Sequence, residues 1–314
     1  MIYVGEIAAL GTAFCWAGSS LSFTAAGKRI GSVPLNIIRL FMAFGMLSAY
    51  LWIVRGLPLP TDASADTWFW LGLSGLAGFT FGDLFLFRAL VLLEARMAML
   101  IMTLSPPMAA IMAWVALGEG LGPWSWLGIA TTVGGVALVV TERHADSPGS
   151  VVAQRGIVVP RDRHVPRRIS PAGVAMAGLG AIGQAAGLVL SKKGIASYDD
   201  AAAATQIRCI AGIAGFVVLF TIAGWWPRVT KALRHRSGMG LAMLGSAIGP
   251  FIGVTLSLVA VRNAPTGIAA TIMAISPILL IPTAAWIHKE RITWRAVAGA
   301  FLAVGGVAML FVQP

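Results

Sequence analysis

Charged side chains inside long apolar stretches are the residues of this sequence best placed to do chemistry. Asp83 lies in "GFTFGDLFLFRAL", and Arg39 lies in "PLNIIRLFMAF". An ionised group at the centre of a membrane-length apolar stretch costs on the order of 3 kcal/mol, so such groups mark pairs or functional sites. We expect Arg39 and Asp83 to share a depth and to pair. The pair is either a switch, in which Asp83 loses its partner when a proton or a solute arrives, or a static lock between two helices.

A second arginine and two uncharged polar residues also fall in apolar stretches. Arg208, in "AATQIRCIAG", could bind the carboxylate or phosphate of a solute, or could cap neighbouring backbone carbonyls. Gln184 and Ser19 are further candidates to bind a solute. For a lone serine the alternative is a hydrogen bond to a carbonyl one turn back in its own helix.

Ser-Pro pairs interrupt two of the apolar stretches. Ser105 precedes Pro106, and Ser276 precedes Pro277. A proline inside a helix frees a carbonyl about four residues back, and freed backbone is tolerated at membrane depth only beside protein or a wet cavity. We therefore predict that Pro106, Pro277 and also Pro250 kink helices that line a path, and that both serines face this path.

Aromatic side chains could supply the walls of such a path. Trp16, Phe79, Phe81 and Phe251 could line a mostly apolar pocket with few polar anchors, the usual composition of a small-molecule site. The alternative is that they face lipid or pack against other helices. A further set of tryptophans at the ends of apolar stretches is typical of the interfacial belt of a membrane protein.

The composition identifies the elements that position these residues. Of 314 residues, 58% are hydrophobic and only 11% are charged, which is a membrane composition. A helix of about 20 apolar residues crosses the hydrocarbon core of a bilayer. Ten such stretches are predicted, near residues 4–26, 35–54, 68–87, 97–117, 124–141, 171–190, 202–224, 239–260, 267–286 and 296–312. The expected fold is an all-α integral membrane protein with ten transmembrane helices.

The two halves of the chain repeat one another. Residues 102–119 read "MTLSPPMAAIMAWVALGE" and residues 273–290 read "MAISPILLIPTAAWIHKE", with identical residues recurring 171 positions later. At the same offset Val254 occupies the place of Asp83, so Arg208 lacks the acidic counterpart that Arg39 has. Each half holds five predicted helices, and an odd number forces the second copy to enter the membrane from the opposite side. We predict two inverted five-helix repeats, 1–141 and 171–314, joined by a basic linker, 142–170.

The positive charges are distributed unevenly between the predicted connections. Odd-numbered connections hold 17 Lys and Arg residues, whereas even-numbered connections hold 4. The positive-inside rule places the odd-numbered connections, including the linker 142–170, in the cytoplasm. Both termini are then expected outside the cytoplasm. The net charge of +11 is interpreted as this topology signal, not as a nucleic-acid-binding surface.

These features together resemble the drug/metabolite transporter superfamily, EamA type. The resemblance rests on ten helices in two inverted halves, a Ser-Pro in the fourth helix of each half, a Glu at the end of that helix, and a Gly-Gly in the fifth. The residues that carry this pattern are Ser105-Pro106, Glu119 and Gly134-Gly135 in the first half, and Ser276-Pro277, Glu290 and Gly305-Gly306 in the second. It implies a secondary transporter whose site lies between the halves. Many relatives have both termini in the cytoplasm, whereas the charge count here implies the opposite orientation in the membrane.

Other functional classes find little support in the sequence. The four histidines lie in loops or at helix ends, and the sequence contains no HExxH motif, no paired intramembrane acids and no Walker motif. We therefore expect no enzyme activity, no catalytic residue, no metal and no cofactor. Small multidrug exporters of the same superfamily carry an acid in the middle of the first helix, whereas residues 11–20, "GTAFCWAGSS", contain none.

The sequence-based expectation is a multi-pass permease of the inner (plasma) membrane. It would export a small metabolite such as an amino acid or a related compound by alternating access, coupled to protons or to exchange, as a monomer or a homodimer embedded in membrane lipid. Two alternatives stay open: a lipid-handling protein of the flippase or scramblase kind, and a proton-coupled drug exporter.

Overall fold

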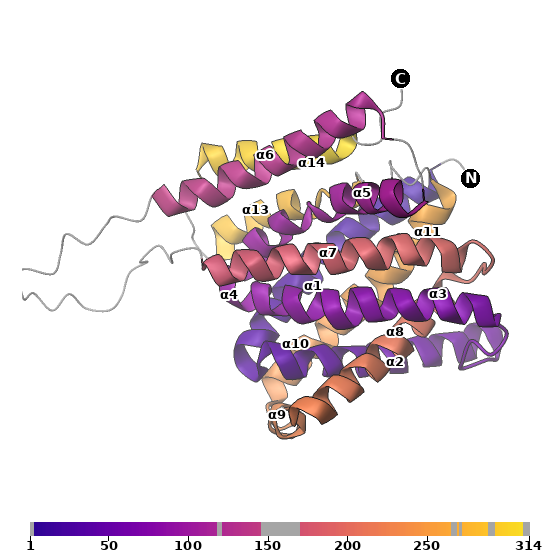
Figure 1. The fold of residues 1–314 in the computed structure, drawn as a ribbon. Coiled ribbons are helices and arrows are strands. Elements are labelled where there is room, and N and C mark those ends of the chain that lie inside the picture. The colour runs from indigo at the N-terminus through magenta and orange to yellow at the C-terminus, as the bar shows by residue number, and fades with distance from the viewer. Residues whose placement is uncertain are drawn as a thin grey trace, which may run out of the picture.

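The part of the chain that the structure describes is helical and contains no strand (Figure 1). This computed structural model describes residues 3–117, 121–145, 170–264, 269, 272–287 and 293–309. The first repeat comprises α1 (Val4–Ile30), α2 (Ser32–Arg55), α3 (Ala65–Gly75), η1 (Leu76–Gly82), α4 (Asp83–Met102), α5 (Ser105–Leu117) and α6 (Pro123–Ala145). The second comprises α7 (Pro171–Ile195), α8 (Ala201–Ala223), α9 (Trp226–Leu233), α10 (Arg236–Ser246), η2 (Ala247–Gly253), α11 (Val254–Asn263), α13 (Ser276–Ile287) and α14 (Trp294–Met309).

Eight segments among the described residues are long and apolar enough to cross a membrane. The ninth predicted helix, near 267–286, falls partly outside the described residues, and the tenth corresponds to α14, which is a shorter apolar helix. The predicted connection between residues 87 and 97 is itself helical, because α4 runs from Asp83 to Met102. The candidate membrane spans on its two sides, Ala65–Leu93 and Ala95–Met112, are nevertheless separate segments, so the third and fourth predicted helices each have a counterpart among the described residues.

Equivalent elements of the two repeats begin and end at equivalent residues. The first residues of α3 and α10 are Ala65 and Arg236, which are 171 positions apart, and η1 and η2 span equivalent residues at the same offset. Both η segments are π-helices, whose wider turns occur mostly at functional sites. The C-terminal end of α2 meets the start of its counterpart α8, because Arg55 Nε lies 3.2 Å from Asp200 Oδ2. These two counterpart helices therefore run in opposite directions.

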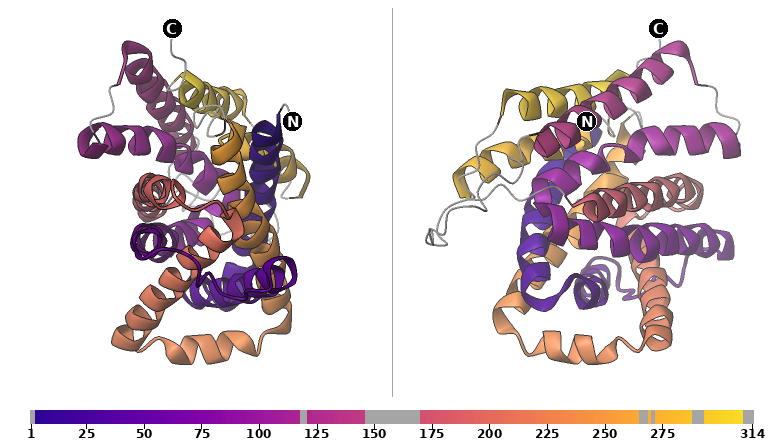
Figure 2. Two further views of the ribbon diagram at one scale, coloured as in Figure 1. Left: turned by 90° about the vertical axis from the view of Figure 1, so that its right-hand side faces the viewer. Right: turned by 60° about the vertical axis from the view of Figure 1, so that its left-hand side comes forward.

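The two repeats interlock through their first helices. Helix α1 packs on α10, η2 and α11, whereas α7 packs on α3, η1 and α4. The contact depends on glycine: a Cβ added to Gly187 would lie 3.0 Å from the Cα of Gly78. Helices α6 and α14 pair with each other at the edge of the bundle (Figure 1 and Figure 2), where a Cβ on Gly306 would lie 2.4 Å from the backbone nitrogen of Thr132. Small residues thus set the closest helix crossings.

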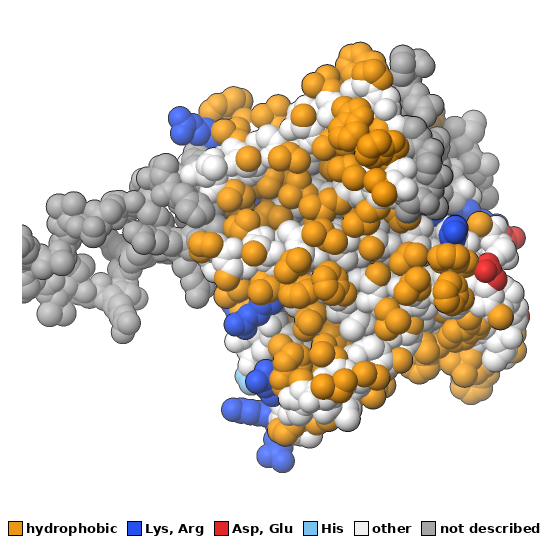
Figure 3. All heavy atoms as spheres, viewed as in Figure 1, with side chains coloured by type: hydrophobic (Ala, Val, Ile, Leu, Met, Phe, Trp, Pro, Cys, Tyr) orange, Lys and Arg blue, Asp and Glu red, His pale blue; other side chains and the backbone are white. Residues whose placement is uncertain are grey.

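The outer surface is largely apolar. Figure 3 shows hydrophobic side chains across the face of the bundle, with most of the visible Lys and Arg along the left side, and acidic side chains at the right next to a further basic group. Large side chains such as Ile53 and Ile222 are more than four-fifths exposed. Apolar exposure of this extent suits a protein surrounded by lipid.

Candidate functional site

A cavity of about 230 Å³ lies between the two repeats. Counterpart elements of both repeats form its wall: α1 and α7, α2 and α8, α4 and α11, and α5 and α13. Its charged lining residues are Arg39, Asp83, Lys192 and Arg208. Small-molecule sites are commonly concave, mostly apolar and anchored by a few polar groups, and this cavity has that composition.

Nearly all of the sequence-derived candidates line this cavity. They are Trp16, Ser19, Arg39, Phe79, Asp83, Ser105, Gln184, Arg208 and Ser276, together with Pro106, Pro250 and Pro277. Phe251 does not line it, and its interpretation as a wall residue needs correction. The ring of Phe251 lies 6.1 Å from that of Tyr50, and the side chain packs against a hydrophobic cluster that includes the lining residue Phe79. The neighbouring Pro250 takes the position facing the cavity.

The predicted pairing of Arg39 with Asp83 is confirmed. Arg39 Nη2 forms an ion pair with Asp83 Oδ2, and the two residues are 3% and 4% exposed. Gln184 Nε2, from the second repeat, donates to Asp83 Oδ1 at 2.6 Å and lies 3.3 Å from the carbonyl of Gly78. Both carboxylate oxygens of Asp83 are therefore engaged, and the cluster joins the two repeats.

Arg208 lies in the same cavity without a hydrogen-bonding partner among the described residues. It is 7% exposed, and its buried Nε has no acceptor. Its guanidinium carbon lies 4.9 Å from the centroid of the Phe79 ring, and Arg39 lies 5.7 Å from the same centroid. The alternative role of capping carbonyls finds no support within the described residues, where no backbone carbonyl accepts a hydrogen bond from this guanidinium.

The Ser-Pro pairs mark helix breaks of a different kind from those predicted. Helix α4 ends at Met102 and α5 begins at Ser105, and in the second repeat α13 begins at Ser276 after an equivalent turn. Pro106 and Pro277 therefore start new helices and do not kink continuous ones. Proline suits the first turn because its missing N–H would have no partner there. Pro250, by contrast, lies inside η2, whose wider turns accommodate it.

The hydroxyls of two of the candidate serines, Ser19 and Ser276, donate to backbone carbonyls. Ser276 Oγ lies 2.8 Å from the carbonyl of Met273 and 3.1 Å from that of Ala13 on α1. Ser19 Oγ lies 3.3 Å from the carbonyl of Trp16. These serines are consequently less free to bind a solute than Arg208 is.

Some residues that line the cavity were not predicted from the sequence. Lys192 lies eight residues beyond Gln184 on α7, so the two share a helix face with Leu188, and this spacing is a signal that could have identified it. Phe87 also lines the cavity, with its ring centroid 4.5 Å from the guanidinium carbon of Arg39. No sequence pattern distinguished Phe87 from other phenylalanines in apolar stretches.

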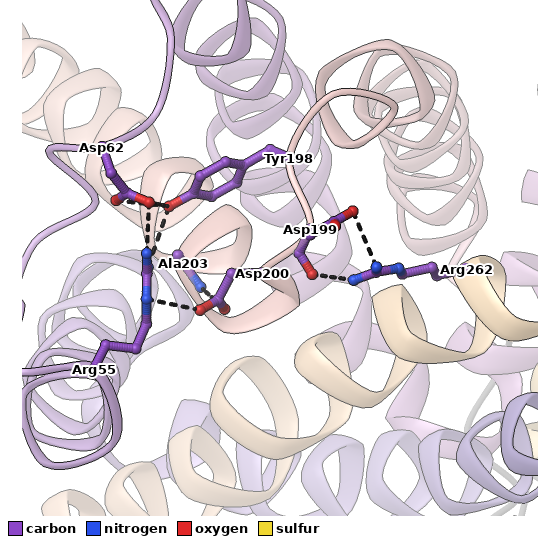
Figure 4. A network of polar contacts seen from close by, with 7 residues as sticks. All are labelled: Arg55, Asp62, Tyr198, Asp199, Asp200, Ala203 and Arg262. Atoms are coloured by element: carbon purple, nitrogen blue, oxygen red, sulfur yellow. Dashed lines mark hydrogen bonds and ion pairs between the residues drawn. The ribbon is translucent and has the colours of Figure 1, made fainter.

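A polar network closes the end of the bundle at which α2 ends and α8 begins (Figure 4). Arg55 Nη2 lies 2.5 Å from Asp62 Oδ2, and Arg55 also contacts Asp200 and, at 3.2 Å, the hydroxyl of Tyr198. Tyr198 donates to Asp62 at 3.0 Å. Residues of the first repeat thereby bind the α7–α8 connection of the second.

The second part of this polar network reaches α11. Arg262 Nη2 lies 3.0 Å from Asp199 Oδ1, and Arg262 also donates to the backbone carbonyl of Asp199 (Figure 4). The adjacent Asp200 caps α8 by accepting from the backbone N–H of Ala203 at 2.9 Å. The short α7–α8 connection is thus held from both sides, by Arg55 and by Arg262.

Two titratable groups in the network have shifted pKa values. Burial acts to raise the pKa of Asp62, but hydrogen bonds from Arg55 and Tyr198 outweigh it, and the pKa lies below the ordinary value. Burial raises the pKa of the Tyr198 phenol above its ordinary value. The carboxylate and the phenol are therefore both kept in the protonation states that the network requires.

Comparisons with known proteins agree with the fold and with its division into two repeats. The family model described as the EamA-like transporter family matches residues 3–141 and again residues 171–312. A Sinorhizobium protein named "Uncharacterized transporter in cobO 3'region" is 32% identical over 133 residues, which are 40% of this chain and 93% of that protein. A crystal structure of a protein that shares 19% identity superposes with a TM-score of 0.58 over 98% of this chain and 96% of its own.

Proposed function

The chain belongs to the EamA-like transporter family, and from that premise we propose that it is a secondary transporter that exports a small metabolite, such as an amino acid or a related compound, across the inner membrane. The observation that carries the proposal is the cavity between the two repeats, lined by counterpart elements of each. In alternating access, one repeat rocks against the other around a site at their interface.

Several features support movement of the repeats against each other. Helices begin at Ser105 and Ser276 beside the cavity, and discontinuous helices of this kind surround the sites of many transporters. At the contact between α7 and η1, the backbones of Gly187 and Gly78 meet directly, and surfaces formed by small residues permit sliding. The sequence contains no Walker motif, so we propose that an ion gradient or solute exchange supplies the energy.

Metabolite profiling of cells and medium, with and without expression, tests the proposal. Purified protein in liposomes loaded with the identified solutes then tests whether it acts alone.

Val254 lines the cavity, so Val254→Trp should block flux, whereas Val218→Trp, at a lipid-facing position of α8, should not. Failure of the wild-type protein to move any solute in both assays would refute the proposal. Transfer of labelled lipid between leaflets in the same liposomes would favour the lipid-handling alternative.

A further inference from the structure

We infer that the cavity binds a small organic acid in its anionic form, with Arg208 as the principal ligand of the carboxylate. This inference rests on the proposed transport function and specifies the chemical class of the solute. It is carried by three observations: the charge balance of the cavity, the unpartnered guanidinium of Arg208, and the aromatic wall beside it.

The charge balance favours an anion. The described lining residues contribute three positive charges, from Arg39, Lys192 and Arg208, and one negative charge, from Asp83. Asp83 forms the ion pair with Arg39 and also interacts electrostatically with Arg208, so one carboxylate faces two buried guanidinium groups. Neither Arg208 nor the half-buried Lys192 forms an ion pair within the described residues. A buried positive charge that is only partly compensated is costly, so an anionic solute would supply a partner for Arg208.

The guanidinium of Arg208 is available to such a solute. Arg208 is 7% exposed and lines the cavity, and no described group accepts a hydrogen bond from it. Its position beside the Phe79 ring, 4.9 Å from the centroid, orients it without using its N–H donors. Guanidinium and carboxylate bind through two parallel hydrogen bonds, an arrangement that a neutral amide cannot reproduce.

The rest of the wall favours an apolar or aromatic body attached to the carboxylate. Trp16, Phe23, Phe79 and Phe87 line the cavity together with several leucine and methionine side chains. The volume of about 230 Å³ accommodates a small molecule rather than a two-chain phospholipid. The solute expected from this wall is a compact acid whose ring or alkyl group packs against the aromatic side chains.

The inference narrows the proposed class of amino acids and related compounds to its net negative members, because a cationic or zwitterionic solute finds fewer partners in this cavity. An ammonium group needs acceptors, and the only carboxylate among the described lining residues is Asp83. Its Oδ1 accepts from Gln184 and its Oδ2 pairs with Arg39, so binding an ammonium group would displace one of these contacts. The cavity therefore suits a net negative solute better than a drug cation.

A matched pair of probes tests the inference: 3-phenylpropionate and its neutral amide share one body and differ in charge. Calorimetry on the purified full-length protein, in phosphatidylcholine nanodiscs, measures the affinity for each. We expect the acid to bind about 10-fold more tightly than the amide or better, because only the acid satisfies Arg208. Phenyl phosphate and a phenyl sulfonate, titrated in the same way, report whether the site prefers a planar carboxylate.

Variants locate the binding group. Arg208→Gln should weaken binding of the acid by about 10-fold or more, and Arg208→Lys should retain part of the affinity. Lys193→Gln is the control, because Lys193 is exposed and lies 4.1 Å from the Trp70 ring, outside the cavity lining. If Arg208→Gln does not fold, the comparison of acid with amide on the wild-type protein still decides the charge requirement.

Three results would overturn the inference: equal affinity for acid and amide, undiminished affinity in a folded Arg208→Gln protein, or no binding of any anionic probe. Phosphatidylglycerol added to the nanodiscs should leave the affinity for the acid unchanged. Strong competition by this lipid would assign the site to a headgroup and would also overturn the inference. If the same preparation transports a neutral or cationic solute, the proposed transport function stands although the inference of an anion-binding site is refuted.

Discussion

Gly82 and Gly183 meet backbone to backbone: a Cβ placed on Gly183 would lie 2.5 Å from the Cα of Gly82. Each glycine is followed directly by a member of the polar cluster, Asp83 in α4 and Gln184 in α7. The close crossing therefore brings the Gln184 amide to 2.6 Å from the Asp83 carboxylate. Packing between the repeats and the geometry of the candidate site depend on the same contact.

Gly183→Ala should destabilise the protein, because the added methyl group cannot fit against the backbone of Gly82. Overpacking of this kind costs about 1–3 kcal/mol. Gly178→Ala, on the same helix with nothing within 4 Å of the added Cβ, is the control and should be neutral or slightly stabilising. Thermal unfolding in detergent compares the two variants. Equal midpoints would contradict the predicted close crossing.

Asp83→Asn should destabilise the protein more than the double variant Arg39→Gln/Asp83→Asn does. Removing one member of a buried ion pair leaves the other charge uncompensated and costs about 3–5 kcal/mol, whereas removing both avoids that penalty. A double-mutant cycle of chemical unfolding measures the difference. A double variant less stable than Asp83→Asn would contradict this account. Gradient-driven transport by the double variant would identify the pair as a static lock instead of a coupling switch.

Much of the site could be predicted from the sequence because charge inside a membrane helix is rare. Arg39, Asp83 and Arg208 stand out in apolar stretches, and their cost in a bilayer ties them to pairs or cavities. The Ser-Pro repetition likewise located Ser105 and Ser276 at breaks beside the cavity. These signals are local, and so a single sequence reveals them.

Features that depend on neighbouring helices could not be predicted in this way. Phe251 is as aromatic as Phe79, but only the packing of η1 and η2 against the other helices decides that Phe79 lines the cavity and Phe251 does not. The π-helical turns before Asp83 and Val254 have no distinctive residue pattern apart from glycines that also serve packing. Lys192 lies beyond residue 190, the predicted end of its helix, and it was not considered as a site residue although its spacing from Gln184 places both on one face of α7.

Arg55→Ala should open the cavity at the end closed by the polar network, if that network acts as a gate in alternating access. The change removes the contacts of Arg55 with Asp62, Tyr198 and Asp200 together. In a background without Cys15 and Cys209, a Lys192→Cys substitution reports access by its reaction with a membrane-impermeant thiol reagent. We expect severalfold faster labelling after Arg55→Ala and no change after Arg228→Ala, which alters α9. Unchanged labelling in the Arg55 variant would exclude the network as a gate.

The same network should persist from about pH 5 to pH 9. The pKa of Asp62 is lowered, so its stabilising charge is complete above the ordinary value of about 3.9 and is lost only as the pH falls through the lower value in the folded protein. The pKa of Tyr198 is raised, so its stabilising proton is complete below the ordinary value of about 10 and is lost as the pH rises through the higher folded value. Labelling at the Lys192→Cys site, normalised to an exposed reference cysteine, should therefore be constant in this window. A change near neutral pH would contradict it.

Topology reporters at Gly56 and Gln154 should lie on opposite sides of the membrane. Gly56 follows α2, at the end that carries the polar network, whereas Gln154 belongs to the basic linker outside the described residues. The excess of Lys and Arg in the odd-numbered connections predicts a cytoplasmic linker and an external Gly56. Fusions of a reporter active only in the cytoplasm and of one active only outside, at both positions, distinguish the two orientations. A cytoplasmic Gly56 with an external Gln154 would show the opposite orientation, and the polar network around Arg55 would then lie on the cytoplasmic side.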